Sequence, residues 1–166
     1  MNTKEKIAYY LLEKKYHKIG RDVKISGLNN TNKVGVIWAL EDKEAFLYIS
    51  GFLKEKQVIF RSLCYTGTSN EVIAHSFSKK ETNFWGFPKS SDVNTFMEFE
   101  YDILMNISVS SCFTLDAVTA LTRAHFKIGW ASGPVNFFDM NIDVSSNKNA
   151  LYLVKQQIHY IEEFNK

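Results

Sequence analysis

The chain has 166 residues, of which 45% are hydrophobic and 23% charged, so it is long enough for one globular domain and too apolar to be disordered. Its net charge of +2 is uneven, because residues 1–24 hold seven Lys and Arg against three Asp and Glu (+4), whereas the rest holds thirteen against fifteen (−2). By charge, the body of the protein is therefore not a nucleic-acid-binding surface.

The first 65 residues predict a helix and then a strand–helix–strand unit. Residues 2–19 form an amphipathic pattern that Asn2 can cap and that leaves its lysines in solvent. The predicted packing face of this helix holds Ala8, Leu12, Tyr16 and Ile19. The continuous apolar run 33–40 is typical of a strand buried on both faces, and a helix over 42–55 and a second strand over 57–65 follow.

The remaining 101 residues predict four more strands and three more helices. The predicted segments are a short strand over 72–77, a loop over 78–91, a helix over 92–99, a buried strand over 102–109, a helix over 114–123, a strand over 125–130, a strand over 138–144 and a helix over 148–164. The strict alternation in 138–144 indicates one wet face, near a sheet edge.

This order of elements is that of a single α/β domain with three layers and a mainly parallel, Rossmann-like sheet, on or beside which the basic N-terminal helix (residues 1–20) packs. The two most buried strands, 33–40 and 101–109, should be central and adjacent. The chain would then reverse direction between them, and a ligand crevice would lie beyond their C-terminal ends.

Four hydroxyl side chains lie at or just after the C-terminal end of the strand 102–109, at that edge. They belong to Ser108, Ser110, Ser111 and Thr114, and Trp38 closes the neighbouring strand. Together with the free N–H groups of a helix N-terminus, they suit a small anion. The alternative is that the serines are turn residues, that Thr114 is a helix cap and that Trp38 is part of the core.

Two residues near this edge are candidates for catalysis. Asp42 follows the first strand and could act as a base, although a carboxylate there also suits the first turn of a helix. Cys112 could be a thiol activated at a helix N-terminus, but the sequence fixes no base beside it. The histidines lack metal-ligand spacing and there is no glycine-rich phosphate motif, so neither a metal nor a cofactor is expected.

Three aromatic residues, Phe84, Trp85 and Phe87, crowd into the predicted loop 78–91. They predict either a partner-binding patch or a lid. The alternative is that the loop folds back and covers one face of the sheet.

Two resemblances rest on short sequence motifs. The strand Tyr101–Ile107, the helix after it and the strand Ala124–Gly129 resemble the N-terminal domain of heptosyltransferase-type glycosyltransferases. That likeness implies Asp42 as the base, but the Gly-Asp pair of those enzymes is missing here. The segments 83–88, 99–102, 126–129 and 137–140 are similar to a family of short uncharacterised proteins of Bacteroidetes bacteria, which implies no known activity.

The expected function is non-catalytic: an interaction or small-ligand-binding module with an unknown protein partner or a small anion. One alternative is a small transferase or hydrolase acting on a sugar or phosphate compound. Another is a protein held at a membrane surface by the basic N-terminal helix. The apolar run 7–12 is too short for a signal peptide, and two cysteines make no disulfide framework, so a cytoplasmic location is expected.

Overall fold

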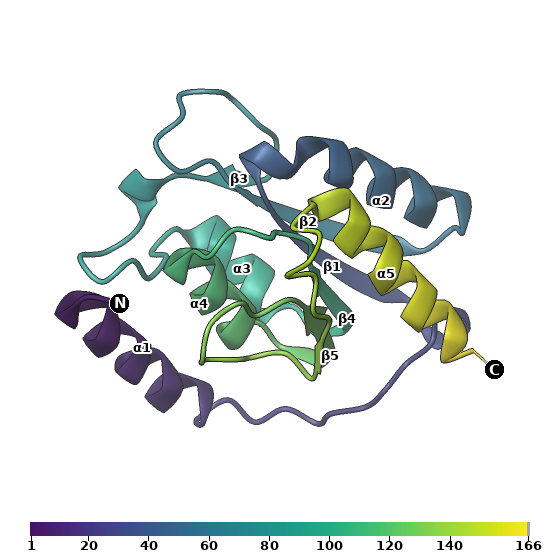
Figure 1. Cartoon of the computed structure of the whole chain (residues 1–166), viewed down its shortest axis with the longest axis horizontal. Coiled ribbons are helices and arrows are strands. Elements are labelled where there is room, and N and C mark those ends of the chain that lie inside the picture. The colour runs from purple at the N-terminus through teal and green to yellow at the C-terminus, as the bar shows by residue number, and fades with distance from the viewer. Residues whose placement is uncertain (166) are drawn as a thin grey trace.

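A six-stranded sheet forms the centre of the protein in the computed structural model, which describes residues 1–165 (Figure 1). The strand order is β3-β2-β1-β4-β5-β6, and every neighbouring pair is parallel. The strands are β1 (Lys33–Ala39), β2 (Ile59–Tyr65), β3 (Ser76–Phe77), β4 (Tyr101–Asn106), β5 (Ala124–Gly129) and β6 (Met140–Asn141). The prediction of a mainly parallel α/β sheet is confirmed.

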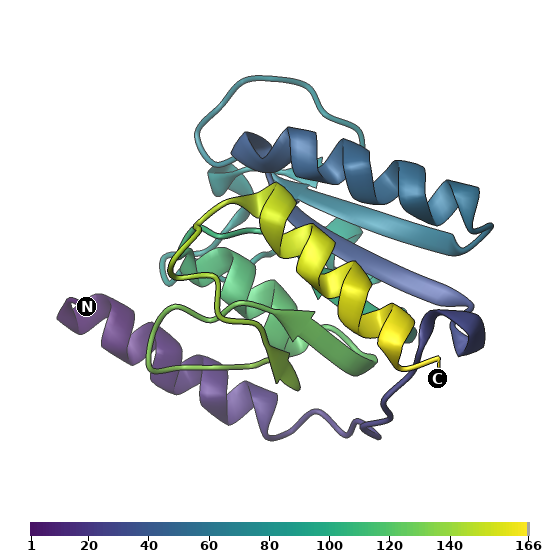
Figure 2. The ribbon, with the colours of Figure 1, turned by 45° about the vertical axis from the view of Figure 1, so that its right-hand side comes forward.

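Helices cover both faces of this sheet. They are α1 (Thr3–Tyr16), α2 (Lys43–Glu55), α3 (Ser91–Glu98), α4 (Phe113–Leu121) and α5 (Ala150–Glu163), with short 3-10 turns at Leu28–Asn30, Leu40–Asp42 and Lys79–Glu81. Helices α2 and α5 lie together on one face, and α3 and α4 lie on the other (Figure 2). This is the predicted three-layer domain. No helix within residues 1–165 is both long enough and apolar enough to cross a membrane.

The chain reverses direction between β1 and β4, as predicted. These strands are neighbours, with Val34 opposite Ile103 and Ile37 opposite Asn106. From β1 the chain builds β2 and β3 toward one edge, and from β4 it builds β5 and β6 toward the other. The C-terminal ends of all six parallel strands therefore meet at one edge of the sheet, where the connections diverge.

The core has two halves, one on each face. Toward α2 and α5, β1 contributes Val36 and Trp38; toward α3 and α4, it contributes Ile37. Because successive side chains of a strand point to opposite faces, a strand buried on both sides is apolar at every position. This explains the continuous apolar run at 33–40.

Helix α1 packs outside α4 and adds a third apolar cluster. Asn2 and Glu5 form a capping box, and Ala8 and Leu12 are buried, as predicted. The cluster joins Leu12 to Phe87, Ala117, Ala120 and Phe137. The helix ends at Tyr16 rather than at residue 19.

Two predicted strands are shorter than expected. Only Ser76 and Phe77 of the predicted strand 72–77 pair with β2, because His75 takes a left-handed backbone conformation (φ 55°) that breaks the extended chain. Of 138–144, only Met140 and Asn141 pair with β5, but burial alternates over the whole segment and it does lie at the sheet edge.

Candidate functional site

A cavity of about 430 Å³ lies beyond the C-terminal ends of β4 and β5. Its walls come from the N-terminal half of α1, the turn after β4, the start of α4 and the loop after β5. The residues that matter below are Glu5, Tyr9, Ser110, Ser111, Asp116 and Trp130. We call this cavity the crevice.

A tyrosine and a carboxylate form the polar centre of the crevice. The hydroxyl of Tyr9 donates a hydrogen bond of 2.6 Å to Oδ2 of Asp116. Burial raises the pKa of Asp116 to about 6, although the hydrogen bond from Tyr9 favours the ionised form. Burial and the neighbouring carboxylate also raise the pKa of Tyr9, so the phenol keeps its proton. The pair therefore offers one acceptor group that changes charge near neutral pH.

A buried polar network holds the turn that forms the crevice floor. The side chain of Asn106, the last residue of β4, donates to Thr119 Oγ1 of α4 (3.0 Å) and accepts from the backbone N–H of Ser108 (3.0 Å). Gln157 of α5 donates to the backbone oxygens of Asn106 (2.9 Å) and Ile128 (3.3 Å). Side chains of α4 and α5 thus hold residues 106–108 in place and link them to β5.

The predicted hydroxyl residues separate into two groups. Ser110 and Ser111 line the crevice, and Ser110 Oγ donates to Glu41 Oε1 (3.0 Å), which ties the end of β4 to the end of β1. Ser108 is buried below the crevice, and its Oγ accepts from the N–H of Ser110 (3.3 Å). Thr114 donates to the backbone oxygen of Gly86 (2.9 Å), and it is Cys112 that stands at the N-cap.

Trp38 belongs to the core rather than to the crevice wall. It is 3% exposed and stacks on Phe46 of α2, with ring centroids 4.2 Å apart and planes at 3°. The tryptophan that does line the crevice is Trp130, which follows β5. An aromatic side chain at a strand end is thus a core cap in one case and a crevice wall in the other.

The two candidate catalytic residues lie outside the crevice lining. Asp42 is 5% exposed, and burial raises its pKa to about 6 against the opposing effect of the Ser108 hydroxyl. Burial also raises the pKa of the Cys112 thiol, despite the nearby helix N-terminus. At neutral pH this thiol is protonated, which is the opposite of an activated nucleophile. Within residues 1–165, no three His, Cys, Asp or Glu side chains are grouped to hold a metal.

The three aromatic residues of the loop have different environments. Phe87 is buried between α1 and α4, and Trp85 is half-buried beside it. Phe84 is 71% exposed, and the ammonium group of Lys4 lies 4.2 Å from its ring centroid.

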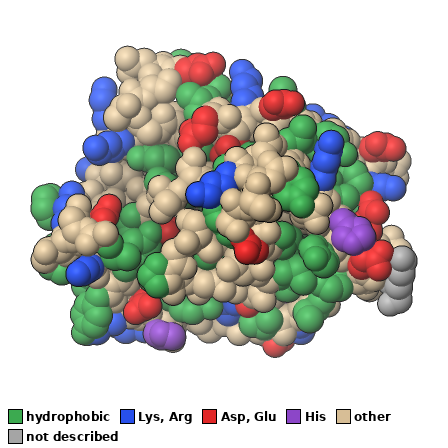
Figure 3. All heavy atoms as spheres, viewed as in Figure 1, with side chains coloured by type: hydrophobic (Ala, Val, Ile, Leu, Met, Phe, Trp, Pro, Cys, Tyr) green, Lys and Arg blue, Asp and Glu red, His purple; other side chains and the backbone are tan. Residues whose placement is uncertain are grey.

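On the face shown in Figure 3, acidic and basic side chains are interspersed.

Tyr9 and Asp116 are not among the site residues that the sequence predicts. For Asp116, the one available signal is its position in the first turn of a helix that follows the serine-rich turn. Tyr9 gave no signal, because 107 residues separate it from Asp116.

Comparison with known proteins gives the family but no activity. No curated protein and no solved structure matches the chain. The sequence pattern of one family of unknown function, DUF6913, matches residues 4–164, which is nearly the whole chain. The protein therefore belongs to the DUF6913 family.

Proposed function

We propose that the protein is a non-catalytic binding module and that its crevice takes a small, neutral compound rich in hydroxyl groups, such as a sugar. The observation that carries the proposal is the Asp116 carboxylate in the crevice wall, held by Tyr9 at 2.6 Å. Ligand sites are typically concave and largely apolar, with a few placed polar groups. Here Trp130 and Val135 supply apolar wall, and Asp116, Ser110 and Ser111 supply the polar groups.

The charge of the crevice favours a neutral ligand over the small anion that the serines alone suggest. Glu5 and Asp116 line the crevice, and Glu41 accepts a hydrogen bond from the hydroxyl group of Ser110. Carboxylates repel an anion, whereas they accept hydrogen bonds from ligand hydroxyl groups.

The resemblance of Tyr101–Ile107 and Ala124–Gly129 to the N-terminal domain of heptosyltransferase-type enzymes supports a sugar as the ligand class. The motifs shared with short Bacteroidetes proteins support an origin in those bacteria. A cytoplasmic location is part of the same proposal, and the two free cysteines, Cys64 and Cys112, suit a reducing compartment.

A small transferase or hydrolase acting on a sugar compound is the second candidate. The specific observation in its favour is the pKa of Asp116, about 6, which suits a general acid or base at neutral pH. In this candidate the catalytic residue is Asp116 and not Asp42, because of these two carboxylates Asp116 alone lines the crevice.

An amide NMR titration tests the proposal, with D-glucose, N-acetylglucosamine and inorganic phosphate as separate probes. We expect binding of at least one sugar with a Kd on the order of 1 mM, with shifts at residues 109–116 and 130–135. Asp116→Asn should weaken it about tenfold, because the carboxylate is the stronger acceptor. Asp42→Asn, a change of a carboxylate at the same sheet edge but outside the crevice, is the matched control and should leave the affinity unchanged.

Shifts confined to other surfaces, or equal loss of affinity in both variants, would contradict the crevice as the binding site. Phosphate binding without sugar binding would contradict the neutral ligand class. Turnover of a nucleotide sugar that disappears in Asp116→Asn would establish the second candidate in place of the first.

A further inference from the structure

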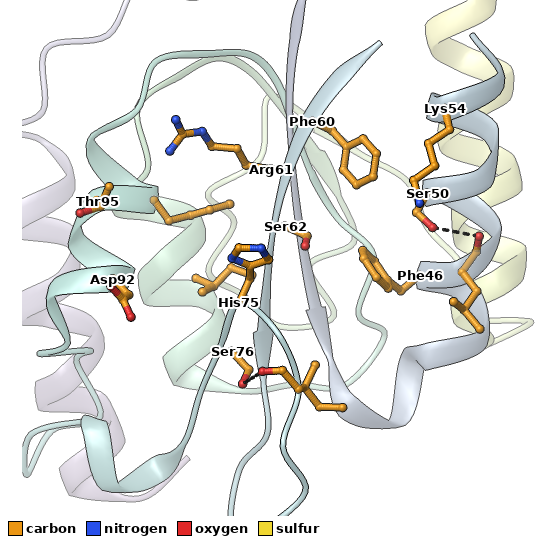
Figure 4. A pocket seen from close by; sticks show the side chains of 14 residues that line it. Phe46, Ser50, Lys54, Phe60, Arg61, Ser62, His75, Ser76, Asp92 and Thr95 are labelled. Carbon is orange, nitrogen blue, oxygen red and sulfur yellow. Dashed lines mark hydrogen bonds between the residues drawn. The ribbon is translucent and has the colours of Figure 1, made fainter. Parts of the chain in front are cut away.

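A second cavity, a groove, lies near the edge of the sheet opposite the crevice. It has a volume of about 910 Å³ and lies between α2 and α3, with the outer edge of β2 along its floor (Figure 4). Figure 4 shows Phe46 and Lys54 on the α2 side of β2 and Asp92 and Thr95 on the α3 side. We call it the edge groove.

The floor of the edge groove is a strand edge with unpaired backbone groups. Strand β3 pairs with β2 only at Cys64 and Tyr65, and the N–H groups of Cys64 and Thr66 donate to β3 residues or to His75 beside them. Backbone groups of a strand alternate in direction, so those of Phe60 and Ser62 point the same way, beyond the end of β3. Among the described residues, the outward-facing N–H and C=O groups of Phe60 and Ser62 have no hydrogen-bond partner.

The two walls of the edge groove differ in chemistry. Phe46 and Phe60 lie on the α2 side and pack against the same apolar cluster, so part of that wall is apolar, and Ser50 and Lys54 add polar groups to it. Arg61 points to the other face, as Figure 4 shows, where its guanidinium carbon lies 3.9 Å from the ring centroid of Phe99. Arg61 is exposed and makes no ion pair with any described residue, so it is free to meet a carboxylate.

We propose that the edge groove binds an extended acidic peptide of another protein as an additional strand on β2. An added strand pairs with the free N–H and C=O groups of Phe60 and Ser62, as in other cases of strand addition. Its side chains alternate between the two walls. Apolar side chains then meet Phe46 and Phe60, and acidic side chains at the positions between them meet Arg61.

Charge selects this occupant over a second copy of the chain. The groove lining carries Lys54 and Arg61 against the single carboxylate of Asp92, so it attracts acidic residues. Two copies joined through antiparallel β2 strands centred on Arg61 would place two arginines directly opposite each other. Like charges in that position destabilise a strand pair.

The test uses the peptide acetyl-Thr-Val-Glu-Val-Glu-Val-Thr-amide and the full chain. We expect a Kd of about 1 mM or tighter and, at saturation, amide hydrogen exchange of Phe60 and Ser62 slowed about tenfold or more. The same peptide N-methylated at its Val and Glu amides lacks the donors for a ladder and should not bind. A peptide with Lys in place of both Glu should bind more weakly.

Matched charge changes separate the groove from the general charge of the protein. Arg61→Glu should weaken binding of the Glu peptide about tenfold or more and improve binding of the Lys peptide. Arg123→Glu makes the same change at an exposed arginine outside the groove and should alter neither affinity.

Several results would overturn the proposal. These are absence of binding at millimolar peptide, binding that survives N-methylation, equal effects of the two arginine variants, and shifts away from the groove. Sedimentation that shows a dimer of the free protein, with Phe60 and Ser62 already protected from exchange, would assign the edge to a second copy instead.

Discussion

Tyr9 of α1 and Asp116 of α4 are joined by a 2.6 Å hydrogen bond, and this contact closes one side of the crevice. Helix α1 is therefore part of the crevice wall. Tyr9 also packs edge-on against Phe113, with ring centroids 5.0 Å apart, so the hydroxyl is held in place by an apolar contact.

The first prediction concerns this pair. Tyr9→Phe removes the donor that stabilises the ionised form of Asp116, so the pKa of Asp116 should rise above its value of about 6. Carboxyl ¹³C NMR titration measures it directly. Tyr10→Phe removes the same hydroxyl from an exposed neighbour in α1 and should leave that pKa unchanged; a shift of equal size in both variants would show that the effect is not local.

The second prediction concerns stability and pH. Asp42 is 5% exposed, and no hydrogen bond reaches its Oδ2 within the described residues. Its pKa is about 6 in the folded protein, against about 4 in the unfolded chain, so the folded state binds more protons between these values. The cost of the buried charge is therefore absent below about pH 4, grows as the pH rises and is complete above about pH 6.

Asp42→Asn should accordingly raise the free energy of unfolding by roughly 1–3 kcal/mol at pH 7.5 and change it little at pH 4. Urea denaturation at both pH values measures this difference. Asp22→Asn, at an exposed carboxylate paired with Lys24, should stay within about 0.5 kcal/mol at either pH. An equal gain at pH 4 and pH 7.5 would show that packing, and not ionisation, is responsible.

The third prediction distinguishes the aromatic residues of the loop. Phe87 is 6% exposed and packs in the cluster with Leu12 and Ala117, so Phe87→Ala should cost about 3–5 kcal/mol of stability. Phe84 is 71% exposed, so Phe84→Ala should change stability by only about 0.5 kcal/mol. Urea unfolding of the two variants gives the comparison, and similar losses would contradict the separation of anchor and surface residue.

The fourth prediction concerns the glycine that ends β5. A methyl group at Gly129 would overlap the ring of Phe138 and lie 3.1 Å from the backbone oxygen of Asn106, so Gly129→Ala should destabilise the protein by about 1–3 kcal/mol. Gly51 in α2 has no atom within 4 Å of that position, so Gly51→Ala should stabilise by about 0.5–1 kcal/mol. Thermal unfolding should shift the two melting temperatures in opposite directions.

The sequence by itself determined the fold class and the central strands. The apolar run at 33–40 lacks alternation because β1 is covered on both faces, and the same holds for β4; their adjacency followed from burial and was confirmed. The cap at Asn2 and the packing face of α1 could also be predicted, because both depend on neighbours within one or two helical turns.

Only the tertiary structure decided which polar residues share a site. Ser110 and Ser111 lie at the C-terminal edge of the sheet, as predicted. Glu41, which accepts from Ser110, and the Tyr9–Asp116 pair, which shares the crevice with the two serines, come from other elements. Lys127 shows the same limit: it reads as a polar position in a strand, yet it is fully buried and its Nζ donates to the backbone oxygen of Ala120 (2.9 Å). Periodicity reports the face on which a side chain lies, whereas the helix or loop that covers that face is set by packing between distant segments, which no local pattern encodes.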